Sequence, residues 1–140
     1  QFHVLGMFLP SLITGNLISK YGSSKIMYLG TFFYLLTIIM SFFDPNFINY
    51  LISLMLLGIG WNFLYISGTS LLVTTYQEHE KFKAQGFNDL VIFSATAIGS
   101  LSAGILISIT SWKIINLMCI PFIILILFSI IRADKNMKIQ

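Results

Sequence analysis

The feature that most constrains this chain is the spacing of its charged side chains. Charged residues make up only 9% of the 140 residues, against about 25% in ordinary soluble domains. They leave five charge-free stretches of at least 18 residues, which are Gln1–Ser19, Ile26–Phe43, Pro45–Gln77, Leu90–Trp112 and Ile114–Ile131. A helix that rises about 1.5 Å per residue crosses a hydrocarbon core of about 30 Å with roughly 20 apolar residues. The sequence therefore predicts an all-α, polytopic membrane protein with five transmembrane helices.

The boundaries of these spans follow from length and from polar residues at their ends. Residues 45–77 form the longest stretch, at 33 residues, yet two crossings with a turn would need about 40, so we assign one span. We place the spans at approximately 1–19, 26–43, 48–76, 89–110 and 113–131, followed by a tail at 132–140. The odd number of spans and a first residue other than methionine lead us to expect a fragment that lacks preceding N-terminal helices of the same chain.

Basic residues give the expected orientation. One side of the membrane receives Lys20, Lys25, Lys81, Lys83, Arg132, Lys135 and Lys138, whereas the other receives only Lys113. Lysine and arginine near span ends stay on the cytoplasmic side. We therefore expect an integral, multi-pass protein of a bacterial-type inner (plasma) membrane, with the tail in the cytoplasm.

Several functional classes lack support in the sequence. The basic residues are scattered along membrane borders, so the net charge of +3 needs no nucleic-acid partner, and lipid is the expected partner. Glu78, His79 and Glu80 lack the second histidine of a helical zinc site, because Lys83 occupies that position. The only cysteine, Cys119, excludes an internal disulfide. We expect no catalytic residues, no metal and no cofactor, hence no enzyme.

The connection between the first two spans reads GNLISKYGSSK. It resembles a signature of the major facilitator superfamily, in which a glycine is followed by an acidic residue, a basic residue, a second glycine and a basic pair. Gly15, Lys20, Gly22 and Lys25 match, whereas Ser19 replaces the acidic residue and Ser24 one basic residue. Glycine and lysine would also suit a tight cytoplasmic turn without a switching role, so both interpretations stay open.

The resemblance extends over the whole chain, including GIGWNFLYISGTSLL and AQGFNDL. The short basic tail favours helices eight to twelve, in the second half of such a transporter. The resemblance implies five helices of a six-helix half-bundle and secondary active transport of a small, unidentified solute by alternating access. The alternative is a membrane scaffold or sensor that keeps this fold without transporting.

Small and polar residues mark the faces that pack or line a cavity in lipid. By this criterion the first, third and fourth spans are expected to be interior, and the second and fifth to face lipid over much of their circumference. Pro10 predicts a kink in the first span. In the fourth span, Ala95, Gly99 and Ala103 begin a ridge of small residues.

Candidate cavity residues lie on the three spans expected to be interior. Asn62, Tyr65 and Thr69 form one face of the third span, which the resemblance places beside the central cavity, and they could equally join helices. The full candidate set is Met7, Trp61, Asn62, Tyr65, Thr69, Phe93 and Thr96.

Candidate gate residues lie near the basic end of the bundle. Asp89 shares a face with Phe93 and Thr96, and it is either a gate or proton-coupling residue or an acidic residue at a helix N-terminus. The resemblance implies that the first connection and the acidic 3/4 connection form part of a cytoplasmic gate. The candidates there are Gly15, Lys20, Gly22 and Lys25.

Overall fold

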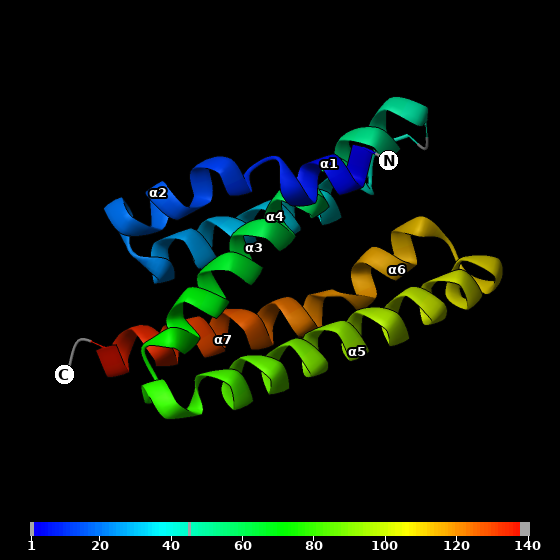
Figure 1. The fold of residues 1–140 in the computed structure, drawn as a ribbon. Coiled ribbons are helices and arrows are strands. Elements are labelled where there is room, and N and C mark those ends of the chain that lie inside the picture. The colour runs from blue at the N-terminus through cyan, green and yellow to red at the C-terminus, as the bar shows by residue number, and fades with distance from the viewer. Residues whose placement is uncertain (1, 45, 138–140) are drawn as a thin grey trace.

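The computed structural model describes residues 2–44 and 46–137, whose regular elements are all helices (Figure 1). They are α1 (Phe2–Phe8), α2 (Ser11–Tyr21), α3 (Ser23–Met40), α4 (Phe47–Val73), the short 3₁₀ helix η1 (Glu78–Glu80), α5 (Lys81–Ile109), α6 (Trp112–Met118) and α7 (Ile120–Met137).

Five helical stretches are long and apolar enough to cross a membrane. They are Phe2–Tyr21, Ser23–Met40, Phe47–Val73, Glu78–Ile109 and Trp112–Lys135. The first consists of α1 and α2, and the last of α6 and most of α7. The prediction of an all-α fold with five transmembrane helices is confirmed.

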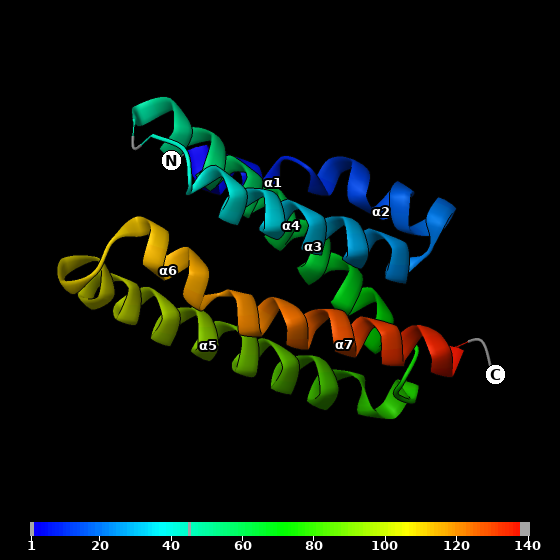
Figure 2. The same cartoon turned by 180° about the vertical axis from the view of Figure 1, so that it is seen from behind.

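The connections alternate between the two ends of the bundle (Figure 2). The N-terminal end of α1, residues 41–44 and residues 110–111 lie at one end, whereas residues 21–22, residues 74–80 and the end of α7 lie at the other. The predicted basic side therefore corresponds to one physical end of the molecule. Lys138, which we assigned to that side, lies outside the described residues. That this end faces the cytoplasm stays a prediction.

Two proline residues lie at or next to breaks in the first and fifth spans. The expected interruption of the first span is present at Pro10, which separates α1 from α2. A second break, which we did not predict, separates α6 from α7 at Cys119, directly before Ile120 and Pro121. Proline has no backbone N–H to donate to the preceding turn, so an α-helix loses a hydrogen bond there.

Glycine pairs bring α4 close to its neighbours on two sides. A Cβ atom added to Gly58 would lie 2.6 Å from the carbonyl oxygen of His3 and 2.9 Å from the carbonyl carbon of Gly6. A Cβ atom on Gly60 would lie 2.9 Å from the carbonyl oxygen of Gly30. Both approaches are backbone to backbone, which only glycine permits at this separation. Consequently α1, α4 and α3 form a closely packed unit.

The burial of α3 and α5 differs from the sequence-based expectation. Within the described chain α5 buries no residue, and a Cβ added to Gly99 would meet nothing within 4 Å. Helix α3, which we expected to face lipid over much of its circumference, buries a face that includes Ser24, Thr31 and Ile38. These three recur every seven residues, which is nearly two helical turns, so they form one stripe of small and medium side chains. The interior assignment of the fourth span is therefore not met within the described chain.

Candidate substrate cavity and gate

A groove of about 330 Å³ lies between α4 and α5. Its walls are Leu64, Tyr65, Gly68, Thr69, Leu71, Leu72 and Thr75 from α4 and the turn after it, and Asn88 and Ile92 from α5. Two of the predicted cavity residues, Tyr65 and Thr69, thus share one hollow. The hydroxyl oxygen of Thr69 is buried without a hydrogen-bond partner. Because an unpaired buried hydroxyl is costly, a ligand or a water molecule in the groove would be the expected partner.

Trp61 and Tyr65 form an aromatic pair one helical turn apart on α4. Their ring centroids are 4.7 Å apart and their planes differ by 9°, which is a stacked arrangement. Both residues are half-buried. The stack limits the positions open to the Tyr65 ring, and that ring forms part of the groove wall.

Asn62 lies outside this groove, in the contact between α4 and the first span. Only 2% of the residue is exposed. Its Nδ2 donates to the backbone carbonyl of Met7 (2.6 Å), and its Oδ1 accepts from the hydroxyl of Thr14 (2.7 Å). That hydroxyl also lies 2.7 Å from the carbonyl oxygen of Pro10. In this structure Asn62 therefore joins helices at the Pro10 break, and Met7 takes part through its backbone.

The three candidates on α5, which are Asp89, Phe93 and Thr96, are not among the residues that line the groove. Asn88 Nδ2 donates to Asp89 Oδ1 (3.3 Å), the hydroxyl of Thr96 donates to the Ile92 carbonyl (2.8 Å), and Phe93 is 57% exposed. The alternative in which Asp89 sits at a helix N-terminus is wrong, because α5 begins eight residues earlier, at Lys81. Asp89 is instead a half-buried acid within a continuous helix.

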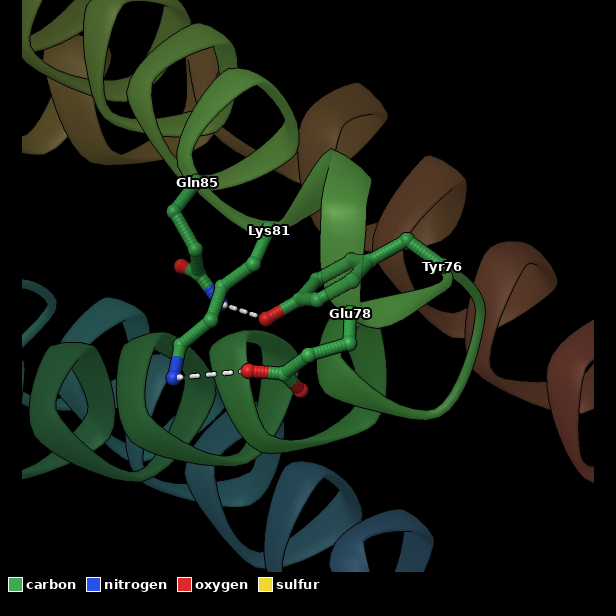
Figure 3. Close-up of polar contacts among 4 residues, drawn as sticks. All are labelled: Tyr76, Glu78, Lys81 and Gln85. Carbon is green, nitrogen blue, oxygen red and sulfur yellow. Dashed lines mark hydrogen bonds and ion pairs between the residues drawn. The ribbon is translucent and has the colours of Figure 1, made fainter.

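The start of α5 is fixed by a compact turn at the basic end (Figure 3). The backbone N–H of Gln77 lies 3.4 Å from Glu80 Oε2 in a reciprocal capping arrangement. Gln85 Nε2 donates to the Tyr76 hydroxyl (2.7 Å), and Lys81 Nζ lies 3.8 Å from Glu78 Oε1. Such capping satisfies backbone groups that a helix start leaves free. It belongs to η1, which leads directly into α5 at Lys81.

The first connection turns sharply at Gly22, whose φ of 85° and ψ of 152° are open almost only to glycine. Its N–H donates to the Ile18 carbonyl (2.8 Å) and ends α2. Gly15 is exposed, and an added Cβ there would meet nothing within 4 Å. Lys20 lies over the Tyr21 ring at 5.2 Å, and Lys25 is exposed.

Neither lysine of this connection pairs with the acidic connector in the described part of the chain. Within that connector, Glu78 pairs instead with Lys81. The assignment of Lys20 and Lys25 to a gate therefore stays a prediction.

Two residues of functional interest were missed from the sequence. Thr14 is not in the candidate set, yet it is fully buried and its hydroxyl donates to Asn62 Oδ1. Asn88 is not in the candidate set either, yet it lines the groove. The signal for Asn88 was its spacing of four residues from Ile92, which places both on one helix face.

Comparison with known proteins places this geometry in a family. The model of the Major Facilitator Superfamily matches residues 2–138. The chain is 37% identical to the riboflavin transporter RfnT of Brucella anthropi, over 96% of this chain and 34% of that protein. It is 33% identical to the uncharacterized MFS-type transporter YdeG of Bacillus subtilis, over 88% of this chain and 31% of that protein.

These matches agree with the helical architecture. The chain spans about a third of the length of these two relatives (34% and 31%). No solved structure matches it. The family model covers nearly every residue, and the five apolar helices are those of a multi-pass membrane protein. The chain therefore belongs to the Major Facilitator Superfamily.

Proposed function

We propose that this chain is part of a secondary transporter that moves a small solute across the membrane by alternating access. The observation that carries the proposal is the groove between α4 and α5, in which Tyr65, Asn88 and the unpaired hydroxyl of Thr69 come together. A few convergent polar groups in a mainly apolar hollow are typical of small-molecule sites. In the intact protein this groove forms one wall of the substrate path, and the remaining helices supply the other.

Riboflavin is the first substrate to test, because the relative that is 37% identical is named a riboflavin transporter. A flavin has a flat aromatic ring system with hydrogen-bonding groups along one edge. Tyr65, which is stacked on Trp61, offers an aromatic surface in the groove, while Thr69 and Asn88 offer polar groups beside it. These features support a planar, polar-edged substrate.

The test is uptake of labelled riboflavin into vesicles that contain the intact protein. Thr69→Val keeps the side-chain shape but removes the hydroxyl, and it should raise KM about tenfold if that hydroxyl bonds the substrate. Thr31→Val is the matched control, because Thr31 is equally β-branched and is buried on α3, where its hydroxyl is already bonded to the Met27 carbonyl (2.9 Å). Equal KM values for both variants would remove Thr69 from the site.

Thiol labelling gives a second test that needs no substrate. In a Cys119→Ala background, a cysteine at position 69 should react with water-soluble reagents, whereas one at the buried Asn62 should not. The opposite order of reactivity would reassign the cavity face of α4. Absence of solute flux for a broad panel of compounds would favour the scaffold or sensor alternative.

A further inference from the structure

A second hollow, of about 450 Å³, lies at the opposite end of the bundle from the basic connections. It is formed where α3 ends, α4 begins and α6 begins. The lining residues include Phe42, Asp44, Tyr50, Ser53, Trp112 and Lys113. Its volume is within the range of about 300–1,000 Å³ that is usual for small-molecule sites. The proposed transport function does not use this hollow.

Two opposite charges line this hollow without pairing. Lys113 Nζ lies 4.4 Å from the centre of the Phe42 ring, a cation–π contact. No ion pair joins Lys113 to Asp44 in the described chain, where the backbone carbonyl of Asp44 accepts from Asn49 Nδ2 (2.8 Å). Both charged side chains are exposed and border the same space. A ligand with one cationic and one anionic group would satisfy both.

One residue in the wall of this hollow, Ser53, has a buried hydroxyl without a partner. Ser53 is 1% exposed, and its Oγ has no hydrogen-bond partner. By contrast, the hydroxyl of Thr37, which also crosses the contact between α3 and α4, donates to the Phe33 carbonyl of its own helix (3.0 Å). An unsatisfied buried hydroxyl requires explanation, and a ligand oxygen in the hollow would supply its partner.

The surroundings indicate a lipid rather than a dissolved solute. Tyr50 and Trp112 pack edge to face with centroids 5.6 Å apart, and such residues favour the headgroup level of a membrane. Phe42 and Phe43 are 51% and 59% exposed beside them. These apolar faces would contact acyl chains while the charges contact the headgroup.

We propose that this hollow binds the headgroup of a zwitterionic phospholipid with a primary ammonium group, such as phosphatidylethanolamine. The phosphate contacts Lys113 and accepts from the Ser53 hydroxyl, and the ammonium donates to the carboxylate of Asp44. A choline headgroup has no N–H to donate to Asp44, and a glycerol headgroup has no cation. The site therefore discriminates between headgroups that share one phosphate.

The test is native mass spectrometry of the intact protein, titrated with phosphatidylethanolamine, phosphatidylcholine or phosphatidylglycerol of identical acyl chains. The wild type should bind the ethanolamine lipid about tenfold more tightly than the others, which corresponds to one charge-assisted hydrogen bond. Lys113→Gln should weaken binding of the ethanolamine lipid by a similar factor, and Asp44→Asn should abolish the preference. Lys113→Arg should retain both.

Lys135→Gln is the matched control, because it removes one exposed lysine at the other end of the bundle. It should leave the lipid preference unchanged. Equal binding of all three lipids by the wild type would overturn the proposal, as would a preference that survives both Lys113→Gln and Asp44→Asn. Displacement of the lipid by an equal concentration of soluble phosphoethanolamine would assign the hollow to a dissolved solute instead.

Discussion

Replacing Gly58 with alanine should push α1 away from α4. The new Cβ would lie 2.6 Å from the His3 carbonyl oxygen, whereas ordinary contact begins at 3.4 Å. To accommodate the methyl group, α1 and α4 would have to separate by about 0.8 Å at this point. The atoms that it meets belong to the backbone of residues 3, 6 and 7, so no side-chain rotation relieves the clash. Overpacking of this kind costs about 1–3 kcal/mol.

The separation would also stretch two hydrogen bonds that cross the same contact. These are Asn62 Nδ2 to the Met7 carbonyl (2.6 Å) and His3 Nδ1 to the Leu54 carbonyl (2.8 Å). Interhelical hydrogen bonds in membranes contribute about 0.6 kcal/mol each on average. The expected total loss in free energy of unfolding is therefore about 2–4 kcal/mol.

The measurement is unfolding of the intact protein in mixed micelles by titration with a denaturing detergent. Gly68→Ala is the control on the same helix, because a Cβ there would meet nothing within 4 Å, and it should change stability by less than about 0.5 kcal/mol. Gly6→Ala addresses the same contact from α1, with its Cβ 2.9 Å from the Met55 carbonyl oxygen. The double variant of Gly58 and Gly6 should lose less than the sum, because the first substitution already separates the helices. A Gly58→Ala variant as stable as Gly68→Ala would refute this account of the packing.

Three further predictions concern polar and turn residues. Asn62→Leu removes two interhelical bonds and should lower the free energy of unfolding by about 1–2 kcal/mol, measured by the same titration; a neutral result would contradict its joining role. Gly22→Ala, at a φ of 85°, should cost about 1–3 kcal/mol, whereas Gly15→Ala should be neutral in stability, and equal effects would argue against strain at the turn. If Asp89 couples protons, Asp89→Asn should abolish uptake driven by a pH gradient and leave solute exchange intact; unchanged driven uptake would exclude that role.

The number of spans could be predicted from sequence because the lipid environment imposes a simple rule. Each crossing must satisfy its own backbone hydrogen bonds, which a helix of about 20 apolar residues does. The charges confined to the borders therefore mark the connections directly. The same rule says nothing about the start of α5, which begins at Lys81 in the polar connector, directly after the capped 3₁₀ helix η1 and before the apolar stretch.

Neighbour relations between helices could not be predicted in the same way. Asn62 and Thr69 are seven residues apart, so they lie on nearly the same face of α4 but about 10 Å apart along its axis. At the level of Asn62 that face meets Met7 and Thr14 of the first span, whereas at the level of Thr69 it borders α5. Because neighbouring spans need not run parallel to α4 or remain unbroken, periodicity identified the face but could not assign its partner at each depth.

The position of the two glycine contacts suggests where this bundle can change shape. Gly58 and Gly60 are two residues apart, about 200° around the helix, so they hold α1 and α3 on roughly opposite sides of the middle of α4. Contacts this close resist sliding, because the atoms that a Cβ on Gly58 would meet all belong to the backbone and those beside Gly60 include the Gly30 carbonyl oxygen. By contrast, α5 buries no residue in the described chain and leaves a groove against α4. Movement that widens or closes the groove would therefore occur at α5, with α1, α4 and α3 moving as one body.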